Sequence, residues 1–75
     1  MGTKTESQVP KLREIILSSL GDLSPQKGDA LHNGVVHRFY AQTETLVFVP
    51  YYDAAMAALL GEDKIGEENN HYYLK

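Results

Sequence analysis

The fold prediction depends on one stretch, NGVVHRFYAQTETLVFV, at residues 33–49. Its first two residues, Asn33-Gly34, are the strongest short-range hairpin signal, because both tolerate the positive φ that a type I′ turn requires. β-Branched and aromatic residues follow at 35–41 and again at 46–49, and these residue types favour strands. Together with a short strand before the turn, the stretch predicts a three-stranded antiparallel meander over residues 29–49.

The two longer strands of this meander would present two different faces, because side chains alternate along a strand. With Thr43-Glu44 at the tip of the second hairpin, Phe39 and Phe48 share one face, which we expect to be the core side. The opposite face combines arginine and tyrosine with apolar residues, a combination typical of protein interfaces. The sequence therefore predicts a protein-contact surface made of Arg38, Tyr40, Val47 and Val49.

A helix is predicted on each side of the meander. Residues 8–20 carry apolar side chains at the three-to-four spacing of a helix stripe, with Pro10 in the first turn and Gly21 just past the end. The second helix is predicted over residues 51–60, between Pro50 and Gly61.

The second predicted helix has no polar side chain between Ala54 and Leu60. A helix that is apolar all round must be covered on more than one side. We therefore expect one side to contact the sheet and another to contact a second copy of the chain. The residues predicted for this self-association, which would form a homodimer, are Tyr52, Ala55, Met56 and Leu59.

The ends of the chain are more polar than its middle. Residues 1–6 have no apolar anchor and are expected to be flexible. Residues 62–70 are predicted to form an acidic loop, and residues 71–74 have the composition of a strand that could be added at the sheet edge. The fold class predicted for residues 1–75 is one small α+β domain. The acidic loop supplies a second candidate protein-contact surface, made of Glu62, Asp63, Glu67 and Glu68.

Composition restricts the function classes. The 75 residues carry a net charge of -3, and their basic residues are scattered, so nucleic acid is a disfavoured partner. No apolar run approaches the roughly 18 residues that a membrane span needs. The first residues also lack the pattern of a signal peptide, so we expect no membrane partner and a cytoplasmic location.

Sequence patterns for catalysis are missing. There is no Gly-x-Ser-x-Gly nucleophile motif, no glycine-rich phosphate loop and no cysteine. Across the predicted Asn33-Gly34 turn, His32 and His37 would lie diagonally on one face, but a stable metal site needs three or four ligands. We therefore expect no enzyme activity, no cofactor and no metal. A small His-dependent or metal-dependent enzyme that uses His32 and His37 is one alternative.

The predicted order of helix, three-stranded meander and helix resembles the double-stranded RNA-binding domain, and residues 53–61 are similar to the alanine-rich last helix of that family. The family reads RNA with a lysine-rich helix start. The matching positions here are Tyr51, Tyr52 and Asp53, so the phosphate contacts of the family would be missing. Nucleic-acid binding by the sheet face, with Arg38 on phosphate and Tyr40 stacked on a base, is the other alternative.

The function that the sequence favours is a non-catalytic protein-interaction module that acts as a regulator, an adaptor or an inhibitor. Phage inhibitors, immunity proteins and antitoxins include small acidic chains of this kind, and no motif selects among them. Binding to the partner protein would use the sheet face and the acidic segment.

Overall fold

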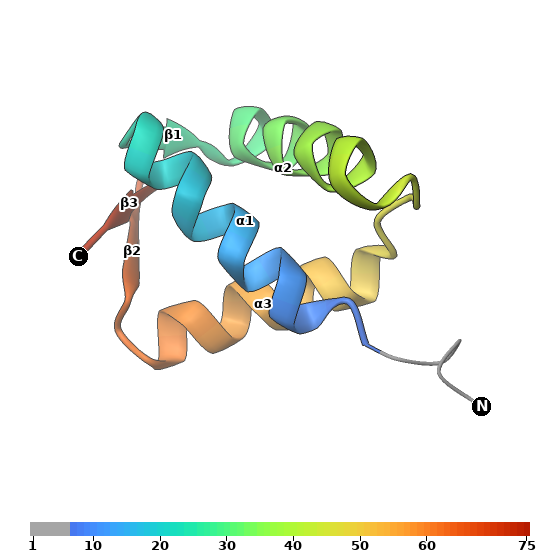
Figure 1. Ribbon diagram of the computed structural model, residues 1–75. Coiled ribbons are helices and arrows are strands. Elements are labelled where there is room, and N and C mark those ends of the chain that lie inside the picture. Colours follow the sequence, from blue (N-terminus) through green and yellow to red (C-terminus); the bar gives the residue numbers. More distant parts are fainter. Residues whose placement is uncertain (1–6) are drawn as a thin grey trace.

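The computed structural model describes residues 7–75 and contains three helices and three short strands (Figure 1). The α+β class is confirmed, as are the helices predicted at 8–20 and 51–60. The prediction for residues 1–6 lies outside the described residues. In chain order the elements are α1 (Val9–Asp22), β1 (Gln26–Lys27), α2 (Gly28–Thr43), α3 (Val49–Gly61), β2 (Ile65–Glu68) and β3 (His71–Leu74).

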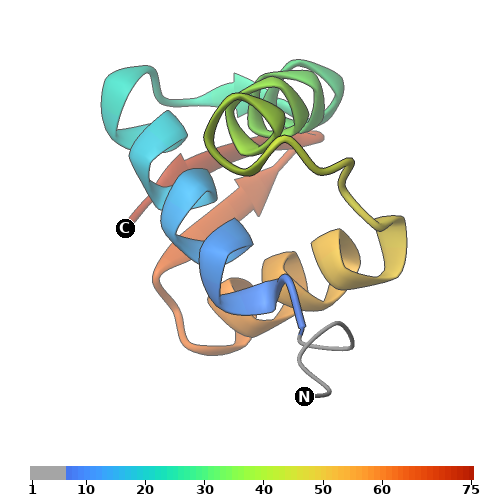
Figure 2. The same cartoon turned by 45° about the vertical axis from the view of Figure 1, so that its right-hand side comes forward.

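The central element of the core is α1. Its buried apolar side chains, Leu12, Ile15, Ile16 and Leu20, recur at helix spacing and form one stripe. Both α2 and α3 pack against α1, which lies between them in Figures 1 and 2. The same core includes Ile65 of β2, so the sheet closes one end of the three-helix arrangement. No helix within residues 7–75 is both long and apolar enough to cross a membrane.

The strands predicted over residues 29–49 are wrong, because this stretch forms α2, the connection after it and the start of α3. Leu31, Val35 and Phe39 are spaced four residues apart and are buried along one side of α2. The expected turn residues, Asn33-Gly34, lie inside the helix without positive φ. Glycine, asparagine and β-branched residues give this segment a weak helix propensity, so its helix depends on packing against the core.

Gly34 offers a direct test of the helical α2. A β-carbon at Gly34 would have open space around it. Alanine is preferred over glycine inside a helix, so we expect Gly34→Ala to raise the free energy of unfolding by about 0.5–1 kcal/mol, measured by urea denaturation. If Asn33-Gly34 formed a type I′ turn instead, Gly34→Ala would lower the free energy of unfolding, because alanine disfavours the positive φ of that turn. A loss of stability would therefore contradict the helix.

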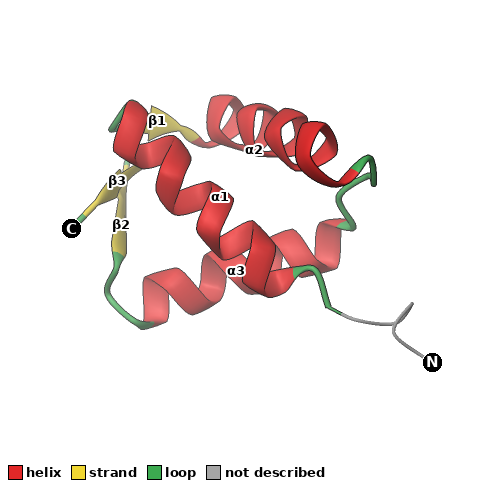
Figure 3. Ribbon diagram, viewed as in Figure 1, coloured by secondary structure: helices red, strands yellow, loops and turns green. Residues whose placement is uncertain are grey.

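The sheet has the strand order β1-β3-β2, with both pairs antiparallel. A three-stranded antiparallel sheet is thus present, but it is built from other segments than predicted (Figure 3). The acidic loop predicted over 62–70 is wrong for residues 65–68, which form β2, and residues 71–74 form the central strand instead of an edge. The hairpin turn between them is Asn69-Asn70, with φ of 53° and 65°. Asparagine tolerates this left-handed region, which explains the turn at this dipeptide.

The observed order of elements also overturns the resemblance to the double-stranded RNA-binding domain, since three consecutive strands between two helices are not what the chain forms. Figure 1 shows the sheet at one end of the molecule and the connection between α2 and α3 at the other. The residues assigned to the two faces of a 29–49 sheet therefore lie on helices and on this connection.

Candidate protein-interaction site

The connection between α2 and α3, residues 44–48, presents large apolar side chains to solvent. Leu46 is 72% exposed and Phe48 is 56% exposed. Tyr40 near the end of α2 and Val49 at the start of α3 are also exposed. We call this surface the apolar corner and define it by Val36, His37, Tyr40, Leu46, Phe48 and Val49.

The backbone of the corner is held from the other end of the chain by the side-chain amide of Gln8. Its Nε2 donates to the carbonyl of Leu46 at 3.1 Å, and its Oε1 accepts the N–H of Phe48 at 2.8 Å. Val47, between the two, is half-buried and packs against the core. Leu46 and Phe48 thus point outward from a backbone that is fixed on both sides of Val47.

A second set of contacts fixes the end of α2. Glu44 adopts the left-handed conformation of a helix C-cap, with φ of 56°, and its N–H donates to the carbonyl of Tyr40 at 2.7 Å. The Thr43 hydroxyl donates to the carbonyl of Phe39 at 2.8 Å and accepts the N–H of Thr45 at 3.2 Å. The chain therefore leaves α2 in a defined direction, which brings Leu46 beside the last turns of the helix.

The corner is hollowed at its centre. An open depression of about 380 Å³ is lined by Val36, His37, Tyr40 and Leu46. Val36 and Tyr40 are four residues apart, so they lie one above the other on the same side of α2. Two residues further along the chain from Leu46, the ring of Phe48 packs edge to face against that of Tyr51 in α3, with centroids 5.3 Å apart.

Comparison with protein-family models, with curated proteins and with solved structures found no match.

The structure divides the contact surface that was predicted as Arg38, Tyr40, Val47 and Val49. Tyr40 and Val49 belong to the apolar corner, and Val47 lies beneath it. Arg38 instead turns towards α1, where its Nη2 donates to Asp22 Oδ2 at 2.7 Å. In a helix, residues two apart point to opposite sides, so Arg38 and Tyr40 do not share a face as they would in a strand.

The predicted acidic surface is also divided. Glu62 receives two hydrogen bonds from the Arg13 guanidinium, at 2.6 and 2.7 Å, and these lower the pKa of the Glu62 carboxyl below its ordinary value. Asp63 pairs with Lys75. Glu67 and Glu68 are exposed on β2, with no ion pair to any residue in 7–75. Two of the four acids thus connect parts of this chain, and the other two face solvent.

The residues predicted for self-association form part of the core. Tyr52, Ala55, Met56 and Leu59 face inward from α3, so the surface expected of them is covered within one chain. Burial, with smaller effects from Tyr72 and Asp53, raises the pKa of the Tyr52 phenol to about 12. The outward side of α3 is also largely apolar, but it consists of other residues, among them Val49, Ala54, Ala57 and Leu60.

The two histidines expected on one sheet face are separated. His32 packs its ring edge to face against Tyr52, with centroids 4.5 Å apart. His37 is exposed and lines the depression of the apolar corner. Residues five apart in a helix are not neighbours on its surface. Within residues 7–75 there is no group of three or more side chains of the metal-binding types that could hold an ion.

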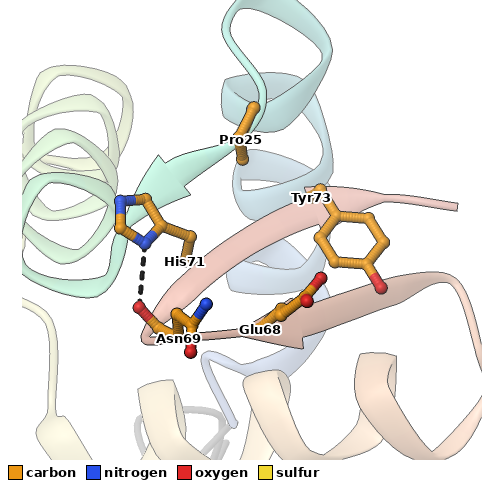
Figure 4. A pocket seen from close by; sticks show the side chains of 5 residues that line it. All are labelled: Pro25, Glu68, Asn69, His71 and Tyr73. Carbon is orange, nitrogen blue, oxygen red and sulfur yellow. Dashed lines mark hydrogen bonds between the residues drawn. The ribbon is translucent and has the colours of Figure 1, made fainter.

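A second depression, of about 430 Å³, lies at the β2–β3 hairpin (Figure 4). Its lining is more polar, and the carbonyl of Asn69 accepts a hydrogen bond from the Nδ1–H of His71 at 2.9 Å. Figure 4 shows the side chains of Glu68 and Tyr73 close together, those of Asn69 and His71 at the turn, and Pro25 on the segment that leads into β1. These residues can form hydrogen bonds with a ligand, but no buried polar group is directed into the depression.

The prediction missed the residues that make the corner distinctive, Gln8, Leu46 and Phe48. Leu46 and Phe48 were assigned to a strand, with Phe48 in the core. Pro50 does not distinguish a strand from a helix, because a proline can follow the end of a strand or stand in the first turn of a helix, as it does here. No sequence pattern marks Gln8, whose role depends on contacts with residues 38 and 40 positions away.

Proposed function

We propose that this protein binds another protein through the apolar corner. The observation that carries the proposal is that Leu46 and Phe48 are exposed on a backbone that Gln8 holds in place. Contiguous apolar patches on small proteins typically mark interaction sites. A loop that is already ordered loses less conformational entropy when it binds than a free loop does, so the clamp favours affinity.

The role that we propose remains that of a regulator, an adaptor or an inhibitor, acting without catalysis and in the cytoplasm. The corner supports a binding role because its lining is mainly aliphatic and aromatic, with His37 as its one titratable imidazole. An open, apolar depression suits an inserted side chain better than a reacting group.

We expect the double variant Leu46→Ser/Phe48→Ser to reduce recovery of the partner by about tenfold or more, since loss of two large apolar contacts at the centre of an interface has effects of this size. The measurement is affinity capture from the native host with quantitative mass spectrometry. Leu23→Ser is the matched control, because Leu23 is 65% exposed and lies at the end of α1, outside the corner. Circular dichroism checks that each variant is folded.

The proposal would be contradicted if the double variant still bound the partner and Leu23→Ser did not. Equal retention by both variants would do so as well, because binding would then not depend on either apolar site.

A second candidate function is nucleic-acid binding, for which the relevant feature is that α2 and α3 are joined by the short connection 44–48. Two helices joined by a short connection are the basis of helix-turn-helix domains, whose second helix enters the DNA major groove. However, α3 contains no lysine or arginine, and its one charged side chain is Asp53. Such a helix has no attraction for phosphates. Retention on DNA at low salt that falls steeply with added salt would favour this candidate over the first.

A further inference from the structure

We infer that the segment bound at the apolar corner is a basic amphipathic one, with lysine or arginine beside its apolar side chains. This inference rests on the proposed function and adds the chemistry of the partner to it. The supporting observation is that most cations of the chain are already paired within it, whereas several carboxylates are not.

Almost every cation in residues 7–75 has a partner in the same chain. Lys11 pairs with Glu14, Arg13 and Lys64 with Glu62, Arg38 with Asp22, and Lys75 with Asp63, which leaves Lys27 at the sheet end. Several carboxylates have no such pair within this range: Asp29, Glu44, Asp53, Glu67 and Glu68. The charge that the folded chain offers to other molecules is therefore mostly negative.

Two of these carboxylates stand beside the apolar corner. Glu44 ends α2, between Tyr40 and Leu46 in the chain, and is exposed. Asp53 follows Val49 by four residues and lies on the same exposed side of α3. Both helices that border the connection thus carry an unpaired acid next to apolar residues. Opposite charge at the rim of an apolar contact selects the partner and speeds its association.

These acids disfavour a second copy of this chain as the occupant. A two-fold contact between identical corners would place the same surface on both sides. Glu44 and Asp53 would then face a surface of their own sign, and like charges at an interface cost free energy. A basic partner removes this repulsion and pairs both carboxylates.

The depression agrees with an amphipathic segment. It is open, and its mainly apolar lining, Val36, Tyr40 and Leu46, suits large aliphatic or aromatic side chains. An amphipathic helix inserts such side chains from one side while its other residues remain at the rim. Basic residues at that rim would meet Glu44 and Asp53.

The test is selection from a display library of random peptides against the full chain. Each selected peptide is then measured against the wild type, Leu46→Ser/Phe48→Ser and Glu44→Lys/Asp53→Lys. We expect peptides that depend on Leu46 and Phe48 to be apolar and basic, and the reversal of charge at Glu44 and Asp53 to weaken their binding about tenfold. The weakening should shrink as salt is added. The matched control is Glu67→Lys/Glu68→Lys, which makes the same change of charge at the opposite end of the molecule.

The outcomes separate this inference from the proposed function. Corner-dependent peptides that are neutral or acidic would overturn the basic partner and leave protein binding at the corner intact. A larger effect of Glu67→Lys/Glu68→Lys than of Glu44→Lys/Asp53→Lys would also overturn it. If no selected peptide depends on Leu46 and Phe48, both the basic partner and the proposed function are wrong. Wild-type protein is also tested for co-sedimentation with phosphatidylcholine vesicles. If it co-sediments and Leu46→Ser/Phe48→Ser does not, the corner binds a lipid surface, and both the basic partner and the proposed function are overturned.

Discussion

Leu59→Ala is expected to lower the free energy of unfolding by about 2–5 kcal/mol, the range for leucine-to-alanine changes in cores. Leu59 is 0% exposed and faces the shared core of α1, α2 and α3. A domain of this length has a total stability of about 4–11 kcal/mol, so the change removes a large share of it and should move the urea midpoint to clearly lower concentration. Urea denaturation followed by circular dichroism measures the effect.

The neighbouring residue supplies the control for this prediction. Leu60 is 37% exposed and lies in the same turn of α3, so Leu60→Ala makes the same chemical change on the outward side. We expect it to cost much less than Leu59→Ala. Equal losses, or a larger loss at Leu60, would mean that α3 is rotated relative to the core described above.

Gly66→Ala is expected to destabilise the protein by about 1–3 kcal/mol, as overpacking of a filled site does. Gly66 is buried in β2 and lies opposite Tyr73 of β3. A β-carbon at Gly66 would overlap the ring of Tyr73, which covers the glycine. The ring must move away to admit the methyl group, and thermal or urea denaturation reports the loss.

A double variant tests the cause of this loss. Tyr73→Ala removes the ring, so Gly66→Ala should cost little in that background, and the two changes should not be additive. Gly61→Ala is the control, because a β-carbon at Gly61 meets no atom within 4 Å. Additive effects of Gly66→Ala and Tyr73→Ala would show that the ring does not lie on the glycine.

The helices α1 and α3 could be predicted because their apolar spacing and flanking proline and glycine act locally. The segment of α2 could not, because its local signals point the other way. Asn33-Gly34 and the β-branched Val35 and Val36 favour a hairpin, while the helical signal is the spacing of Leu31, Val35 and Phe39. That spacing matters only once α1 provides a surface to bury it, which is a tertiary effect.

The same limit applies to the candidate site. Tyr40 and Val49 were predicted contact residues and are exposed at the corner, although the strand geometry behind that prediction was wrong. Arg38 was misplaced because two residues of separation mean one face in a strand and opposite sides in a helix. The pairing of Glu62 with Arg13 joins residues 49 positions apart, and no local sequence pattern predicts such a contact.

The amide of Gln8 also determines how another chain can approach residues 46–48. It occupies a carbonyl and an N–H two residues apart, the pair of groups that a neighbouring strand would use. The Phe48 carbonyl is occupied as well, because it accepts the N–H groups of Tyr51 and Tyr52. An incoming strand would have to displace the Gln8 amide before it could pair with these groups, which disfavours strand addition between copies, the common route from an exposed apolar edge to aggregation. The corner thus displays leucine and phenylalanine to a partner from a segment in which these backbone groups are already hydrogen-bonded.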